Sequence, residues 1–287
     1  MISGTRYRLS AEIARQTQLS KNIERAQTDI STTVRIQAPS DDPAAAARIA
    51  AISRAQANET VWSTNVEAAS STASRGDTTI ASVRTAINRA LELMTSAGTG
   101  TLNDADRQSI AVELRGIADD ITAASTQTDS NGSPLFAPAG QAGLRIPVGN
   151  GLFVSPTASR ADIFEGIPTP SGPSDVASII NSAAAAISLT DPTARAAATS
   201  DALTAVNAAS QRITAASGDQ GVRGKQIDSA RERLAASTEA LGEERTTLEG
   251  TDIPSTVAKL QAMLLSLQAA QTTFARVSQA NLFALLN

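Results

Sequence analysis

The sequence predicts a mainly α, elongated rod in which long helices from the two halves of the chain pack antiparallel as coiled coils, with a small β-hairpin region between them. Apolar residues make up 41% of the 287 residues, but aromatic residues make up only 2%. Alanine supplies much of the rest, and small side chains fill thin seams between helices better than they fill a globular core. Seven of the 11 prolines lie between Pro134 and Pro173, so long helical flanks enclose a middle rich in helix breakers.

A coiled-coil-like stripe opens the chain. Leu9, Gln16, Ile23 and Ile30 recur every seven residues, and Ile13, Leu19, Ala26 and Val34 fill the intervening positions. The stripe stops near residue 38, where Pro39, Ser40, Asp41, Asp42 and Pro43 follow. We expect Asp42 to be the N-cap of the next helix and Pro43 its first residue, because proline has no N–H to leave unpaired there. The adjacent carboxylates could also suggest a metal or acid–base site, but no nearby residue completes one.

The next helix is expected over residues 44–97, and another begins after Asn103 or Asp104, each with an apolar stripe at helical spacing. Residues 144–148 and 152–155 flank Gly149-Asn-Gly151, which predicts a β-hairpin turn rather than a nucleotide loop. Helical pattern resumes at Ser174, breaks at Asp191-Pro192, and then runs to about residue 249 with irregularity near Gly218, Gly221 and Gly224. After Pro254 comes the cleanest heptad pattern, formed by Val257, Leu260, Leu264, Leu267 and Phe274, and the chain ends with Leu282 and Phe283 close to the terminus.

The sequence contains no cysteine and no histidine. This excludes cysteine nucleophiles, Cys/His zinc sites, Ser-His-Asp triads and imidazole acid–base chemistry. No P-loop lysine is present either. The excess of arginine over lysine reflects genomic base composition more readily than phosphate binding. We therefore expect no catalytic, cofactor or metal site and no nucleic-acid partner.

The start of the chain shows no apolar signal region, and no stretch reaches the ~18 apolar residues that a membrane span needs. We expect no membrane insertion and, if the protein is extracellular, export without signal cleavage. Both ends are apolar-striped helices without a local core. The predicted organisation is a terminal coiled-coil domain from residues 1–36 with 255–287, a helical rod from 37–134 with 174–254, and a β-hairpin segment at 135–173. The terminal helices could pair within one domain or with another subunit.

Five motifs, in order along the chain, carry a resemblance to a known family. They are Gln37–Ala46, Gly100–Arg107, Asp129–Ala137, Leu248–Ile253 and Ala280–Leu286. Together they resemble the hook–filament junction proteins of the bacterial flagellin family, over roughly residues 1–165 and 200–287. Filament flagellins, the alternative, usually read Asp-Asp-Ala-Ala-Gly where this chain has Asp41-Asp42-Pro43-Ala44-Ala45. The stretch at Ser133-Pro134 departs from the family's usual Gly-x-Tyr-x-Phe.

The resemblance implies a structural, non-enzymatic role in the extracellular bacterial flagellum. It implies export through the flagellar type III apparatus and a chaperone that shields the C-terminal helix beforehand. The partners would be other copies of the chain, the first hook-associated protein and flagellin, with the apolar residues of both terminal helices in the contacts. A cytosolic helical signalling rod is the more remote alternative, since such rods need an uninterrupted hairpin tip. A secreted polysaccharide-acting enzyme has less support, because no set of convergent carboxylates is visible.

Overall fold

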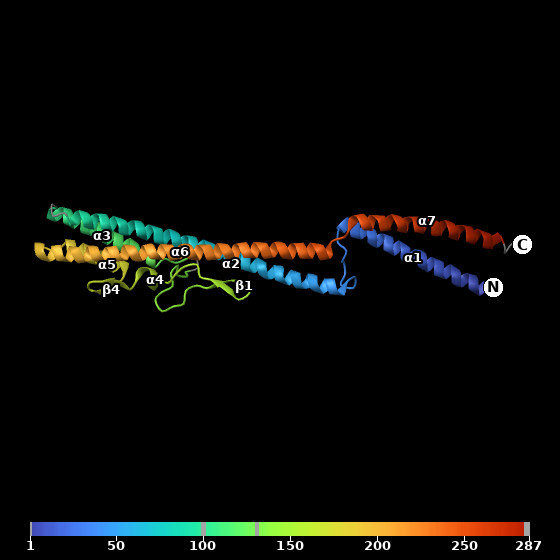
Figure 1. The fold of residues 1–287 in the computed structure, drawn as a ribbon, viewed down its shortest axis with the longest axis horizontal. Coiled ribbons are helices and arrows are strands. Elements are labelled where there is room, and N and C mark those ends of the chain that lie inside the picture. The colour runs from blue at the N-terminus through green and yellow to red at the C-terminus, as the bar shows by residue number, and fades with distance from the viewer. Residues whose placement is uncertain (1, 99–101, 130–131, 284–287) are drawn as a thin grey trace. The chain divides into compact units, whose positions relative to one another are not determined.

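The computed structural model describes residues 2–98, 102–129 and 132–283, and it divides into two compact units. The first unit combines residues 1–56 with 238–287, and the second contains residues 57–237. The helices α2 (Pro43–Ala97) and α6 (Pro192–Glu249) contribute to both units (Figure 1).

In the first unit, α1 (Ile2–Thr32) and α7 (Ile253–Phe283) lie side by side and run antiparallel (Figure 1). α1 ends earlier than the predicted position near residue 38. The cause is a short backbone pairing in which Arg35 N–H donates to the Glu249 carbonyl at 2.7 Å and Thr251 N–H donates to the Thr33 carbonyl at 3.0 Å. These bonds take residues 33–35 out of the helix and join the segment after α1 to the segment before α7.

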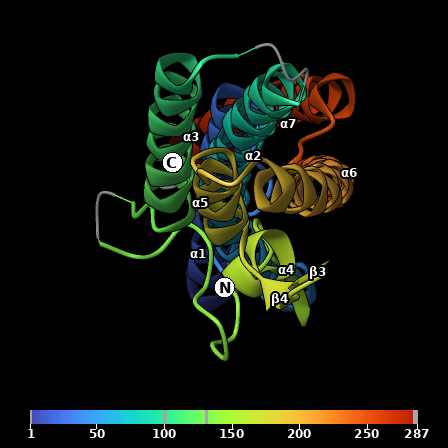
Figure 2. The same ribbon diagram turned by 90° about the vertical axis from the view of Figure 1, so that its left-hand side faces the viewer.

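The second unit is a helical bundle of α2, α3 (Asp104–Ser125), α5 (Val176–Ile187) and α6 (Figure 2). Asn103 caps α3 by accepting a hydrogen bond from Asp106 N–H, and Asp191 caps α6 through Ala194 N–H at 2.7 Å. α6 runs without interruption past Gly218, Gly221 and Gly224, so the expected irregularity there is wrong. The rest of this helix packs on the bundle, and tertiary packing can override the weak helix propensity of glycine.

The main core of this unit lies between its four helices. It contains α2 residues from Ile80 to Met94, α3 residues from Ala111 to Ile121, most of α5, and α6 residues from Ala202 to Ala216. Alanine is frequent in it, as the composition predicted. The aromatic contribution is one edge-to-face pair, Phe136 and Phe164, whose ring centroids are 5.3 Å apart.

The middle of the chain forms two antiparallel hairpins instead of the one that was expected. In the first, β1 (Ile146–Gly149) pairs with β2 (Leu152–Val154), and Gly151 takes the positive φ of 74° that the turn needs. In the second, β3 (Ile167–Thr169) pairs with β4 (Gly172–Ser174). A short helix, α4 (Arg160–Phe164), connects the hairpins. The second hairpin was missed because its strands are short and proline-rich, which normally argues against a strand.

Three polar side chains of α6 hold this middle segment against the bundle. Gln220 Nε2 donates to the carbonyls of Ala73 at 3.1 Å and Pro156 at 2.8 Å, and Gln220 is buried. Arg212 and Arg223 donate to the carbonyls of Glu165 and Ser155. Gly76 of α2 leaves space for Thr157 of the middle segment, because a Cβ at position 76 would lie 2.7 Å from the Thr157 Cγ2 atom.

Candidate assembly surface

The terminal helices α1 and α7 are joined by a narrow apolar seam. In α1 the less exposed side chains recur at heptad spacing: Gln16, Leu19, Ile23, Ala26 and Ile30. In α7 the corresponding side chains are Val257, Leu260, Met263, Leu267, Ala270 and Phe274. Among the described side chains of these two helices, only Ile23 and Ala26 are buried, and they keep 7% and 6% of their surface exposed. A two-helix pair of this kind therefore leaves much of its own apolar stripe accessible to water.

Some of the residues that the sequence singled out point away from this seam. Ile13 is 51% exposed and Leu264 is 44% exposed, while their neighbour Leu265, which the heptad pattern did not mark, is 69% exposed. Met263 takes the position in the seam that the pattern gave to Leu264. The seven-residue repeat of Leu260, Leu267 and Phe274 stays in the seam, and only the position between two repeats differs: the side chain three residues after Leu260 faces the seam, whereas the one four residues after it does not. The side chains of Leu9, Leu282 and Phe283 lie outside the described residues.

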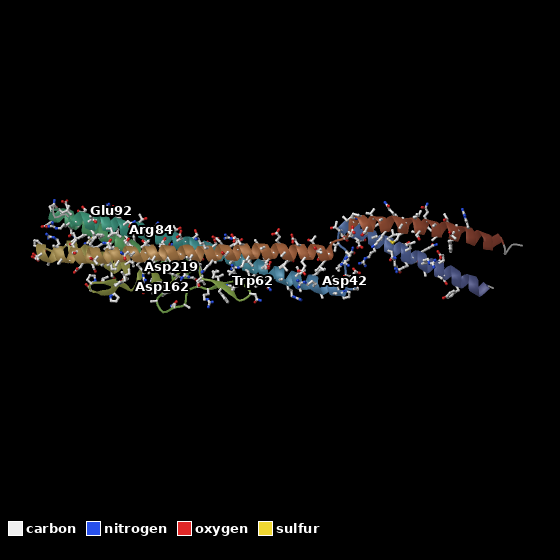
Figure 3. The ribbon with its side chains drawn as sticks, in the orientation of Figure 1. Asp42, Trp62, Arg84, Glu92, Asp162 and Asp219 are labelled. Atoms are coloured by element: carbon white, nitrogen blue, oxygen red, sulfur yellow. The ribbon has the colours of Figure 1, made fainter. Side chains whose placement is uncertain are left out.

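The segment Pro39–Pro43 lies at the start of α2, where Figure 3 labels Asp42. Pro43 is the first residue of the helix. The Asp42 Oδ1 atom accepts a hydrogen bond from Ala45 N–H at 3.1 Å, and this satisfies one of the free N–H groups of the first turn. The hydrogen bond to Ala45 and the Arg35 guanidinium lower the pKa of Asp42. Both favour the ionised carboxylate at neutral pH.

Asp41 does not cap the helix but bonds to the loop before it and to α1. Its Oδ2 accepts from the backbone N–H groups of Gln37 and Ala38 at 3.1 and 3.0 Å, and its carboxylate pairs with both terminal nitrogens of Arg25. The bond from Arg25 is the main cause that holds the pKa of this carboxyl well below its usual range, and the backbone N–H groups add to it. Asp41 thereby closes the loop 37–41 and attaches it to α1.

Arg35 completes the connection between the loop and α6. It donates to the Asp42 carboxylate at 3.4 Å and to the Leu248 carbonyl at 3.2 Å. Arg48 pairs with Glu244 through two hydrogen bonds at 2.6 and 2.8 Å, so α2 and α6 are also linked here. Sequence reasoning missed Arg25 and Arg35, because their partners are distant in sequence and no motif marks them.

The described residues give no support for a metal centre. They contain no group of three or more acidic side chains that could hold a metal ion, and both Asp41 and Asp42 already have arginine and backbone partners. The geometry around Pro39–Pro43 is that of a helix start and a closed loop. In the same described part, no helix is long and apolar enough to cross a membrane.

Comparison with known proteins gives three results. Residues 7–140 match the family described as the bacterial flagellin N-terminal helical region. Flagellar hook-associated protein 3 of Salmonella typhimurium is 39% identical over 108 residues, and the same protein of Escherichia coli is 36% identical over 108 residues. Each match covers 38% of this chain and 34% of the relative, so the matched part spans about a third of these relatives.

The third result concerns the fold. The crystal structure of flagellar hook-associated protein 3 from Legionella pneumophila has a TM-score of 0.62 to this chain at 15% identity, covering 70% of this chain and 98% of that one. The likeness shows a shared helical, flagellin-like fold. The resemblance to the flagellin family that the sequence motifs indicated is thus confirmed over residues 7–140, and the predicted fold class is confirmed for the chain.

Proposed function

We propose that this chain is a structural subunit of the bacterial flagellum that joins hook-associated proteins to the flagellin filament and acts by self-assembly. The observation that carries the proposal is the match of residues 7–140 to the flagellin N-terminal region, together with the two relatives, both hook-associated protein 3. The proposed role is mechanical rather than catalytic.

The exposed apolar side chains of the terminal helices support assembly as the mode of action. Ile13, Leu264 and Leu265 are large, and each leaves about half or more of its surface in water. Burying one leucine side chain contributes roughly 1.5–3 kcal/mol. Neighbouring copies would gain this free energy by covering the open sides of α1 and α7, whereas an isolated pair of helices is only marginally stable in water.

The partners follow from this role. Copies of the chain would form the ring or short axial segment, with the first hook-associated protein on one side and flagellin on the other. Before export, a flagellar chaperone would cover the apolar positions of α7. The chain would leave the cell through the flagellar type III apparatus without cleavage of a signal peptide.

A filament flagellin is the second candidate, since the matching family is itself described as flagellin. Electron microscopy of flagella labelled with gold on an epitope-tagged chain separates the two. The proposed role requires label confined to the boundary between hook and filament. Label along the whole filament would establish the flagellin role instead. In a deletion strain, the proposed role further requires intact hooks and flagellin secreted into the medium.

The role of the terminal helices can be tested with matched charged variants. Leu264→Asp with Leu265→Asp places two charges on the exposed apolar positions of α7. Gln261→Asp with Ser266→Asp places the same two charges on exposed polar positions of the same helix. We expect the first variant to be secreted but not incorporated into flagella, and the second to be incorporated normally. Equal incorporation of both variants would contradict assembly through this surface.

A further inference from the structure

The second unit carries an apolar groove with a basic rim that the proposed function does not use. The groove has a volume of about 490 Å³ and lies between the hairpin β1–β2 and α6. Leu152, Phe153 and Val222 line it and are 50%, 51% and 55% exposed, respectively. Exposed apolar side chains gathered at one place on a surface are typical of protein contacts rather than of free surface.

The rim of the groove is positively charged. Lys225 and Arg233 line it, and the Arg145 guanidinium lies 4.9 Å from the centroid of the Phe153 ring. None of these three cations forms an ion pair with any residue that the structure describes. Asp219, labelled in Figure 3, precedes Val222 by one turn of α6 but does not line the groove. The groove therefore suits an apolar side chain accompanied by carboxylates.

An exposed apolar side chain with carboxylates beside it is found on α3 of the same chain. Val112 is 58% exposed, and Gly116, Asp119 and Ala123 follow it on the same face of the helix, with Asp120 at its border. A Cβ at Gly116 would meet nothing within 4 Å, so the face is flat there. Asp119 and Asp120 form no ion pair within the described residues. Arg115 borders this face, which leaves it with a net negative charge.

Three other exposed large apolar residues, Leu264, Leu265 and Ile13, lack this combination. Among the described residues outside the groove, Leu264 and Leu265 lie on α7, which carries no carboxylate after Asp252. Ile13 is followed by Arg15, which pairs with Glu12. On α3, seven to eight residues separate Val112 from the two aspartates, which is about 10–12 Å along a helix. On α6, Lys225 and Arg233 lie three and eleven residues after Val222, which is about 4.5 and 16.5 Å along the helix, so the two aspartates fall between the two cations when Val112 lies beside Val222 and both helices run in the same direction.

We propose that the groove between β1–β2 and α6 binds the outer face of α3 of a second copy of this chain. Val112 enters the groove beside Phe153 and Val222, and Asp119 and Asp120 pair with Lys225 and Arg233. The proposal rests on the proposed function only in that the chain assembles with itself, and it names the contact. Because the two surfaces are different, the contact is head-to-tail, and repetition of it gives a ring or a helical array rather than a closed dimer.

The placement of the two surfaces supports this arrangement. α3 and the hairpins lie on different sides of the bundle in the second unit (Figures 1 and 2). A copy can therefore use both surfaces at once, one toward each neighbour. If the α3 face and the groove lay on the same side of the bundle, the two neighbouring copies would clash with each other.

The first test is a charge exchange measured by sedimentation of the purified full chain. Variant A carries Asp119→Lys and Asp120→Lys, and variant B carries Lys225→Glu and Arg233→Glu. Each variant alone brings like charges together, so we expect self-association at least about tenfold weaker than that of the unmodified chain. In an equimolar mixture, the α3 face of A meets the groove of B, and the α3 face of B meets the groove of A. Association should therefore return in the mixture.

The second test uses the absence of cysteine from the chain. Val112→Cys and Val222→Cys variants, mixed and treated with a short bifunctional maleimide, should yield a cross-linked dimer. Val112→Cys mixed with Ala235→Cys, an exposed position on another face of α6, should not. A monomeric unmodified chain, no recovery in the charge mixture, or equal cross-linking by both cysteine mixtures would overturn the proposal. These measurements need no flagellum, so a failure of the junction role would leave their outcome unchanged.

Discussion

The two units of this protein bury their side chains to very different degrees. In the bundle of residues 57–237, Ile80, Ile87, Leu114 and Ile180 are completely buried, and the core continues through α2, α3, α5 and α6. In α1 and α7, the described side chains include only two buried ones, Ile23 and Ala26. Long helices alone do not make a core, because a helix needs neighbours on several sides to cover its apolar face. The bundle has these neighbours within one chain, and the terminal pair does not.

The largest expected consequence concerns local stability. In dilute monomer, amides of α1 and α7 should exchange with solvent at least about a thousandfold faster than amides of α3 and α5, corresponding to roughly 4 kcal/mol. The reason is that opening the terminal pair exposes little buried surface. Hydrogen exchange measured by mass spectrometry checks this. Equal protection of both regions at low concentration would show that the terminal helices are stable without assembly.

The same comparison can be made with one type of substitution in both units. Ile180→Ala removes a fully buried side chain of α5 and should lower the free energy of unfolding by about 2–5 kcal/mol. Ile13→Ala removes a half-exposed one from α1 and should cost less than about 1 kcal/mol. Urea unfolding followed by circular dichroism measures both. Fluorescence of Trp62, the one tryptophan of the chain, reports on the bundle alone.

Two glycine-to-alanine substitutions should change the free energy of unfolding in opposite directions. Gly76→Ala would place its Cβ 2.7 Å from the Thr157 Cγ2, and Thr157 is held by a hydrogen bond to the Leu135 carbonyl. We expect a loss of about 1–3 kcal/mol, larger than the gain in helix propensity. Gly221→Ala meets nothing within 4 Å in α6 and should stabilise by about 0.5–1 kcal/mol. Thermal unfolding of the two variants decides between these signs, and a stabilised Gly76→Ala would contradict the close contact.

The smallest expected effect is that of Asp41. Asp41→Asn should speed hydrogen exchange at the amides of Gln37 and Ala38, which donate hydrogen bonds to the Asp41 carboxylate. The control Asp77→Asn, at an exposed position of α2, should leave their exchange unchanged. The pKa of Asp41 is lowered in the folded chain, mainly by Arg25. Its contribution is therefore complete above the unfolded pKa of about 3.9 and is lost as the pH falls through the folded pKa. Protection of these amides that is unchanged in the variant would contradict this role.

The sequence predicted the helical layout well, because its signals are local. Proline at 43 and 192, with an aspartate before each, marked two helix starts that the structure has. The β-hairpin at Gly149–Gly151 followed from turn chemistry, although the second hairpin escaped notice because its strands contain Pro168 and Pro173.

The contacts between distant segments could not be predicted. Arg25 and Arg35 look like ordinary surface arginines, and their roles depend on where α6 ends. The heptad pattern marked Leu264, whereas Met263 lies in the seam, since both the third and the fourth residue after Leu260 are compatible with heptad spacing. The groove beside Phe153 likewise depends on how the hairpin packs on α6.

The backbone pairing between the segments beside α1 and α7 depends on a glycine at position 250. Val34 and Gly250 form the bridge between the segment that follows α1 and the segment that precedes α7, and a Cβ at position 250 would lie 2.6 Å from the Thr246 carbonyl oxygen. That oxygen is main chain and cannot rotate away like a side chain. A single missense codon at this position would therefore disturb the attachment of both the first and the last helix, although it changes only one of the two segments.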